Sequence, residues 1–255
     1  MLFALPFFVM IALYTNRKNP GADLTKKDWL MVVLLGITGY YLASLFDFVG
    51  LQYITAGLER LILFIYPTLV VILSAVFFKK KIGRKEYFAL ALTYAGILIV
   101  FVNDLNFSQE NIILGIVLIF GSALTYAIYL MGSGELIPKL GSMRYTSYAM
   151  IVSTVAVLVH FAFTNDNSLW GFPAKVYWLS LFMAVFSTVI PGLLLSEGIR
   201  MIGSGRASII GSIGPVSTII LAYIFLGEKI TFYQVLGTAL VLAGVLAVSS
   251  NKRKG

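Results

Sequence analysis

Residues 50–99 read GLQYITAGLERLILFIYPTLVVILSAVFFKKKIGRKEYFALALTYAGILI. Residues 198–247 read GIRMIGSGRASIIGSIGPVSTIILAYIFLGEKITFYQVLGTALVLAGVLA and align with them without a gap, at an offset of 148 positions. Apolar segments align easily by chance, but these two share prolines, glycines and a Lys-Ile dipeptide at the same places. A repeat of this length predicts two copies of one structural unit. The identical pairs include Gly50/Gly198, Ile54/Ile202, Pro67/Pro215, Leu73/Leu221, Phe77/Phe225, Lys81/Lys229, Ile82/Ile230, Ala95/Ala243 and Gly96/Gly244.

The composition places both copies in a membrane. The 255 residues are 59% hydrophobic and 12% charged, whereas a soluble domain is nearer half apolar and a quarter charged. A soluble fold of this size could not hide so much apolar surface, so we expect an all-α integral membrane protein. Cysteine is absent and His160 is the only histidine. A disulfide framework, a thiolate site and a histidine cluster are therefore excluded, and we expect neither a metal nor a cofactor.

The apolar runs predict nine transmembrane helices. About 20 helical residues cross a hydrocarbon core of about 30 Å, and a further run at 2–15 is shorter, about 21 Å long at 1.5 Å per residue. The long runs lie at 30–51, 56–78, 87–103, 111–131, 145–163, 176–196, 205–226 and 231–249.

Basic residues orient these spans. One set of alternate connections holds 16 Lys and Arg residues, and the opposite set holds only Lys175 and Lys229. Lys and Arg concentrate in cytoplasmic loops, so we expect the C-terminus to be cytoplasmic and the protein to lie in the cell (inner) membrane. The net charge of +8 then belongs to membrane loops, and no nucleic acid is expected as a partner. The 16 residues are Arg17, Lys18, Lys26, Lys27, Lys79, Lys80, Lys81, Arg84, Lys85, Lys139, Arg144, Arg200, Arg206, Lys252, Arg253 and Lys254.

Five spans separate the two copies, so the copies are expected to be inverted in the membrane, as in many secondary transporters. We assign residues 1–104 to the first repeat and 111–250 to the second. The second contains five predicted helices and the first only four and a short run. We therefore expect one helix to be absent before Met1, with ten helices in the intact protein. A chain without that helix could be a truncated subunit, or could borrow one from a second copy in a homodimer.

Each copy starts with Gly-Leu or Gly-Ile followed by small residues, then has a mid-helix proline, an aromatic-rich end, and a last helix that carries Ala-Gly. This pattern resembles the EamA family of the drug/metabolite transporter superfamily. The first copy keeps Pro67 and Gly96 but has Lys80 where the family commonly has glutamate. The second copy matches better, through Pro215, Phe225, Leu226, Gly227, Glu228, Gly237 and Gly244.

The resemblance implies ten helices in two inverted halves with a central cavity between them. It also implies a permease for a small organic solute such as an amino acid, another metabolite or a drug, often an exporter. Its motifs are structural and carry no substrate identity.

Several polar residues within the predicted spans are candidates for a substrate cavity or gate, because an intramembrane ionisable group is expensive unless paired or wetted. Gly36, Tyr40, Ser44 and Asp47 recur at helical spacing and would share one face. That stripe suggests a cavity wall. Alternatively, Asp47 is a solvated helix end at the outer interface.

Glu59 and Arg60 open the next helix at the same level. Adjacent helical residues point about 100° apart, so we expect Arg60 to pair with Asp47 rather than with Glu59. The group could bind a zwitterionic or anionic solute, form an outer gate or carry a coupling proton. The alternative is that Glu59 complements the helix N-terminus while Arg60 extends outward.

Prolines interrupt helices at matching places, since Tyr66-Pro67 and Gly214-Pro215 are repeat counterparts. Broken helices flank binding sites in transporters, although each could be a structural kink only; Pro191 is a third candidate kink. Tyr126 could supply a phenolic contact or be an interfacial anchor. The remaining candidates, which could line a cavity or only permit close helix packing, are Ser187, Ser208 and Ser212.

The leading hypothesis is a secondary carrier that moves a small solute by alternating access, with protons as a possible coupling ion. A non-transporting membrane scaffold is the alternative. A membrane enzyme acting on a lipid-linked substrate is disfavoured. The sequence has no P-loop, no Gly-x-Ser-x-Gly and no His-Glu-x-x-His motif, so neither ATP hydrolysis nor proteolysis is supported.

Overall fold

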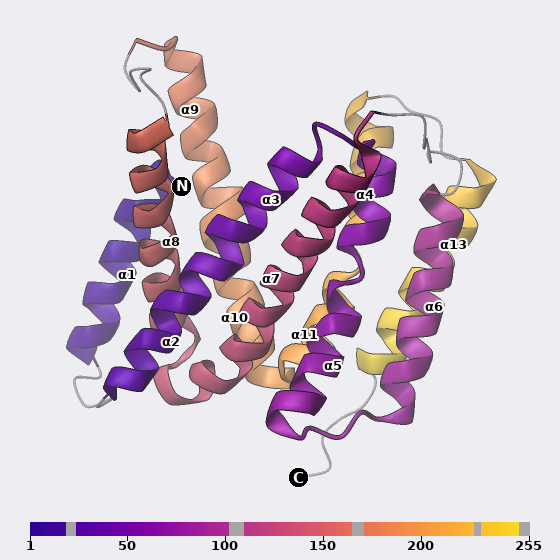
Figure 1. The fold of residues 1–255 in the computed structure, drawn as a ribbon, viewed down its shortest axis with the longest axis horizontal. Helices are drawn as coiled ribbons and strands as arrows, with labels where there is room; N and C mark the ends of the chain where they lie inside the picture. Colours follow the sequence, from indigo (N-terminus) through magenta and orange to yellow (C-terminus); the bar gives the residue numbers. More distant parts are fainter. Residues whose placement is uncertain (19–23, 102–109, 165–170, 227–230, 250–255) are drawn as a thin grey trace. The chain divides into compact units, whose positions relative to one another are not determined.

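The computed structural model describes residues 1–18, 24–101, 110–164, 171–226 and 231–249. Every regular element within these ranges is helical (Figure 1). Three of them, η2, η4 and η5, are π-helices, which hold one more residue per hydrogen-bonded turn than an α-helix. The elements are η1 (Leu2–Ala4), α1 (Leu5–Lys18), α2 (Lys26–Gly36), η2 (Ile37–Leu42), α3 (Ala43–Gly50), α4 (Ala56–Leu63), α5 (Tyr66–Phe78), α6 (Arg84–Phe101), α7 (Ile112–Leu140), α8 (Ser142–Thr164), α9 (Ala174–Met183), η4 (Ala184–Val189), α10 (Ile190–Ile202), α11 (Ser204–Gly211), α12 (Gly214–Leu221), η5 (Ala222–Leu226) and α13 (Phe232–Ser249).

The chain is an all-α, multi-pass integral membrane protein. Large apolar side chains remain exposed along the helices, among them Phe163, which is 87% exposed; such a surface needs lipid around it. The count of nine spans stays a prediction. Gly227, Glu228 and Lys229 lie outside the described ranges, so what was predicted for them also stays a prediction. The helices that are long and apolar enough to cross a membrane are Lys26–Gly50, Ala56–Phe78, Ile112–Leu140, Ser142–Thr164 and Ala174–Ile202, with Phe232–Ala247 shorter.

One predicted boundary was wrong. The span expected at 111–131 continues as α7 to Leu140, so that only Gly141 separates it from α8. The apolar pattern ends early because small and polar residues follow, and these pack against a neighbouring helix. A Cβ on Gly132 would lie 2.6 Å from Leu35 of α2. Close helix contact therefore replaces lipid contact over the last turns of α7.

The helices form two compact units. The first unit comprises Met1–Leu42 and Ile128–Gly203, and the second unit comprises Ala43–Ala127 and Ser204–Gly255. Each unit therefore combines helices from both sequence repeats. Neither unit coincides with one repeat, because the chain passes between units inside the helix Lys26–Gly50 and inside α7.

The helix bounds follow the sequence repeat. Within the second unit, α4, α5 and α6 begin at residues 56, 66 and 84, and α11, α12 and α13 begin at residues 204, 214 and 232, an offset of 148 in each case. The same offset relates the starts of α2 and α9 in the first unit, at residues 26 and 174. Both of these helices then pass into a π-helix, η2 or η4. The repeat is thus visible in the backbone beyond the stretch where the sequences align.

Helices α6 and α13 of the second unit make one contact twice. A Cβ on Gly96 would lie 2.5 Å from the carbonyl oxygen of Gly237, and one on Gly244 would lie 2.8 Å from that of Ala89. Gly96 and Ala89 are the repeat counterparts of Gly244 and Gly237 at the offset of 148. The contacts run in opposite directions along the two helices, so the counterparts are antiparallel and related by a local twofold. Glycine is required at Gly96 and Gly244 because the backbones touch there.

The core of the first unit surrounds α8. Phe8 of α1 and Met150 of α8 are fully buried and cluster with Ala184 and Val189 of η4. On another side of α8, a Cβ on Gly36 would lie 2.7 Å from the carbonyl oxygen of Ala149. Apolar packing and small residues therefore hold α1, α2 and η4 against one central helix.

Candidate functional site

The candidate site residues are divided between the two units. Tyr40, Ser187 and Pro191 lie in the first unit. The others lie in the second: Ser44, Asp47, Glu59, Arg60, Tyr66, Pro67, Tyr126, Ser208, Ser212 and Pro215.

Glu59 is a buried acid in the first turn of α4, 5% exposed. The helix begins after Thr55, whose hydroxyl accepts a bond from the Leu58 backbone N–H at 3.3 Å. Arg60 Nε lies 3.3 Å from Glu59 Oε2. The expectation that these neighbours do not pair was wrong, because the long arginine side chain folds back over the turn that separates the two Cβ directions.

Asp47 of α3 lies beside this pair. Its carboxyl interacts with both Arg60 and Glu59. Within the described part of the chain, its Oδ1 is buried without a hydrogen-bond donor. Two carboxyls therefore face one guanidinium, and a single bound proton would bring the cluster to zero net charge. We call Asp47, Glu59 and Arg60 the acid cluster.

Both prolines of the repeat follow an interruption of their helix. The backbone leaves helical bonding between Leu63 and Tyr66, and again between Gly211 and Gly214. Proline has no N–H, so Pro67 and Pro215 cannot bond to the carbonyls of Leu63 and Gly211 four residues earlier. The interruption therefore falls at the same register in both copies.

Tyr66 links the two interrupted helices of the second unit. Its ring is buried, and its hydroxyl donates to the Ser208 carbonyl at 3.2 Å. Tyr126 of α7 packs edge-on against it, with ring centroids 5.2 Å apart. The Ser208 hydroxyl donates to the Gly205 carbonyl within its own helix, and Ser212 is buried beside Tyr66. Three other predicted residues, Tyr126, Ser208 and Ser212, thus lie around the Tyr66 side chain.

In the first unit, a tyrosine group surrounds Tyr40. Its ring lies 5.1 Å from that of Tyr129, which stacks on Tyr145 at 6.2 Å. The Ser133 hydroxyl donates to the Tyr129 carbonyl at 2.6 Å, so the Tyr145 hydroxyl is the donor in its 2.7 Å bond with Ser133.

Tyr129, Tyr145 and Ser133 were not among the predicted site residues. Tyr129 is fully buried and Tyr126 is half-buried. The physical reason is the length of α7, whose end at Leu140 puts Tyr129 well inside the helix. The four-residue spacing of Tyr129 and Ser133 was the available signal.

A π-helix crosses the predicted stripe of Gly36, Tyr40, Ser44 and Asp47, and the common face of these residues stays a prediction. The π-helix η2 covers Ile37–Leu42, and its extra residue per turn changes the angular register of everything beyond it. Gly36 packs against α8, and Ser44 is half-buried on α3, less than one turn before Asp47.

Pro191 lies at the start of α10, directly after η4. Without an N–H it cannot bond to the Ser187 carbonyl, which favours the wider π turn before it. The Ser187 side chain itself is exposed. His160 of α8, the single histidine, bonds through Nδ1 to the Tyr41 hydroxyl of η2 at 2.9 Å.

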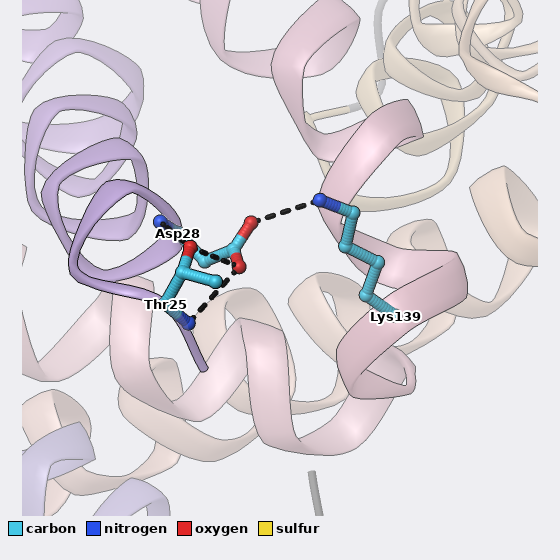
Figure 2. Close-up of polar contacts among 3 residues, drawn as sticks. All are labelled: Thr25, Asp28 and Lys139. Atoms are coloured by element: carbon cyan, nitrogen blue, oxygen red, sulfur yellow. Dashed lines mark hydrogen bonds and ion pairs between the residues drawn. The ribbon is translucent and has the colours of Figure 1, made fainter. Parts of the chain in front are cut away.

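Charged residues tie α2 to α7 in the first unit (Figure 2). Thr25 caps α2: its hydroxyl oxygen accepts a bond from the Asp28 backbone N–H, and the Asp28 carboxylate accepts one from the Thr25 backbone N–H, which completes a capping box. Lys139 Nζ then lies 2.9 Å from Asp28 Oδ1. Figure 2 shows the Asp28 carboxylate between the cap and the lysine. Among the described residues, no three His, Cys, Asp or Glu side chains gather as a metal site would require.

Comparison with known proteins agrees with this architecture. The chain is 31% identical to the uncharacterized transporter YcbK of Bacillus subtilis (strain 168), over 99% of this chain and 82% of that protein. It is 27% identical to an uncharacterized transporter of Archaeoglobus fulgidus, over 89% of this chain and 80% of that one. A solved crystal structure, 16% identical, shares the fold with a TM-score of 0.76 over 98% of this chain and 86% of that chain.

The family comparison covers nearly the whole described chain. Residues 1–102 and 113–250 each match the EamA-like transporter family. A two-fold match agrees with the helix bounds that repeat at an offset of 148. The protein is therefore a membrane transporter that belongs to the EamA-like transporter family.

Proposed function

We propose that the protein is a proton-coupled secondary transporter that exports a small organic solute, such as an amino acid, another metabolite or a drug, by alternating access. The observation that carries the coupling is the acid cluster, in which two carboxyls share one guanidinium inside membrane-spanning helices. Intramembrane acids of this kind mark proton relays and ion pathways.

The cluster can exchange a proton for a charged solute group. Glu59 is buried, whereas the Arg60 side chain is 40% exposed. The accessible arginine can bind a carboxylate of the solute, and the two ionised carboxyls can bind an ammonium group, which uptake of a proton by either acid would release. Binding of a proton and of a solute then change the same local charge, which is what coupled transport requires.

The division into two units supports alternating access. The chain passes between the units at Leu42–Ala43, at Ala127–Ile128 and at Gly203–Ser204. The first passage is the end of π-helix η2, and the third follows Gly203, whose φ is +84°. A π-helical end and a glycine in a left-handed conformation are places where a backbone can change direction at small cost. We assign hinge roles to both.

The charges of the first unit support a cytoplasmic C-terminus and a location in the inner membrane. Seven of its eight Lys and Arg residues lie at the ends of α1, α7 and α10 and at the starts of α2 and α8, the eighth being Lys175 at the start of α9. We call this the basic end. Under the positive-inside rule, the basic end faces the cytoplasm. The homodimer raised by the sequence analysis remains a proposal, tested by the mass of the purified protein in detergent.

Flux into proteoliposomes tests the function. Purified protein is reconstituted with a pH gradient, and uptake or counterflow is measured for a panel of amino acids, metabolites and drugs. We expect at least one solute to move in response to the gradient, and Asp47→Asn and Glu59→Gln to abolish that response. Glu86→Gln is the matched control, because Glu86 pairs with Arg206 at a helix start in the same unit. No gradient-dependent flux for any solute would refute transport, and unchanged coupling in both acid variants would refute the cluster's role.

A further inference from the structure

A pocket of about 340 Å³ opens at the basic end of the first unit. Its lining residues come from the C-terminal ends of α1, α7 and α10 and from the N-terminal end of α8. These helices are labelled in Figure 1. Its charged lining consists of Lys18, Arg144, Arg200 and one carboxylate, Glu197. The lining therefore carries two net positive charges, and it contains no residue of the acid cluster.

The single carboxylate is already satisfied from within the protein. The Ser142 hydroxyl donates to Glu197 Oε2 at 2.6 Å, and Arg200 Nε donates to both carboxylate oxygens, at 3.0 and 2.9 Å. Glu197 thus holds the Arg200 guanidinium at the pocket wall. Its interactions with Ser142 and Arg200 leave it poorly suited to receive a cationic ligand.

Arg144 is also held in position. Its Nε donates to the Tyr148 hydroxyl at 3.2 Å, and that hydroxyl donates to Asn16 Oδ1 at 2.7 Å. Arg144 follows the turn at Gly141, where φ is +80°, and stands in the first turn of α8. The first N–H groups of a helix have no intrahelical partner and carry partial positive charge. Two positioned guanidiniums, an ammonium and a helix N-terminus together suit a phosphate.

We propose that this pocket binds a phosphate group, supplied by an anionic lipid headgroup or by a soluble phosphate ester. Its level in the membrane fits a headgroup. Trp29 packs on Tyr148 at 4.9 Å, and such aromatic side chains concentrate at membrane–water interfaces. Basic pockets between helix ends bind anionic headgroups. The proposal does not depend on which solute the protein transports.

Binding of defined lipids tests the proposal. The protein in neutral detergent is titrated with phosphatidylglycerol, with phosphatidylcholine and, separately, with inorganic phosphate, and binding is followed by native mass spectrometry and by the shift in melting temperature. We expect a preference for one or both phosphate sources that carry net negative charge. Arg144→Gln and Lys18→Gln should each weaken binding about fivefold, since a basic residue near the surface contributes about that factor.

Lys175→Gln is the matched control, because Lys175 is the first unit's basic residue at the start of α9, away from this pocket. It should leave the affinity unchanged. Preference for phosphatidylglycerol with no response to inorganic phosphate identifies a lipid site, and a response to both identifies a general phosphate site. Equal affinity for phosphatidylcholine, or an equal loss in Lys175→Gln, would overturn the proposal. If Arg144→Gln does not fold, Lys18→Gln tests the same expectation on an exposed side chain.

Discussion

The two interrupted helices of the second unit have matching backbone bounds, but at two of their positions one copy has charged side chains and the other has small ones. Helices α4 and α11 start and end at matching positions, and so do the interruptions before Pro67 and Pro215. Glu59 and Arg60 of the acid cluster, however, correspond to Ala207 and Ser208 at the offset of 148. The charged copy and the small copy therefore share a fold without sharing a chemical role.

The difference is complementary. Tyr66 of the first copy places its hydroxyl 2.7 Å from where a Cβ on Gly211 would lie. The counterparts of these two residues are Gly214 and Leu63. The large Tyr66 side chain of one copy thus fits because the other copy has glycine, without a side chain, at position 211. The shared prolines preserve the interruption of the helix in both copies. The other positions have diverged, so that α4 carries Glu59 and Arg60 where α11 carries Ala207 and Ser208.

The largest effect should come from making the charged copy resemble the small one. In the double variant Glu59→Ala/Arg60→Ser, we expect the protein to fold and its transport rate to fall by about tenfold or more, equivalent to at least ~1.4 kcal/mol on the limiting step. Flux in proteoliposomes and circular dichroism measure the two outcomes.

The control for this prediction is Lys85→Ser/Glu86→Ala, which makes the same change of charge at the start of α6. It should retain transport. Comparable loss in both double variants would mean that the acid cluster has no special role, and loss of helicity in the first would mean that its charges are structural.

The next effect tests where the copies are equivalent. Gly96→Ala and Gly244→Ala each force a methyl group against a backbone carbonyl that cannot move aside, so each should lower the free energy of unfolding by about 2–3 kcal/mol. The two losses should match, because the contacts are counterparts. Unfolding in detergent micelles provides the measurement.

Gly198→Ala serves as the reference, since its Cβ would meet nothing within 4 Å. In a helix this change should be neutral or stabilising by up to about 1 kcal/mol. A large loss at only one of Gly96 and Gly244 would contradict the local twofold.

A smaller effect tests the complementary pair. Gly211→Ala should cost about 1–2 kcal/mol, because the new methyl displaces the buried Tyr66 hydroxyl. Tyr66→Phe removes that oxygen and its bond to Ser208, at about 1 kcal/mol. Together they should cost less than the sum, and a double-mutant cycle measures the coupling. Strict additivity would show that the two sites do not constrain each other.

The smallest effect lies in the first unit, where the counterpart helices α2 and α9 begin at matching positions but have different N-cap residues, Thr25 and Pro173. Thr25→Ala should destabilise by about 1 kcal/mol, since it removes the cap. Pro173 caps α9 without a side-chain bond, so Pro173→Ala should stay within about 0.5 kcal/mol. Thermal unfolding of both variants checks this, and equal losses would contradict the assigned role of the capping box.

Much of the fold was predictable from local sequence. An apolar composition requires lipid, a repeated proline removes the same backbone donor in both copies, and paired glycines mark close contacts. These properties depend on a residue and its near neighbours along the chain. The acid cluster was partly predictable for the same reason, because a short connection brings the start of α4 close to the end of α3.

Other features depended on contacts between distant segments. The burial of Tyr129 against Tyr40 arises from packing between distant segments, which no periodicity contains. The grouping of helices is the clearest case. The sequence alone determined that the chain holds two copies of one membrane-embedded pattern. Only the tertiary structure decided that each compact unit combines both copies, because counterpart helices such as α6 and α13 bury their glycine faces against each other.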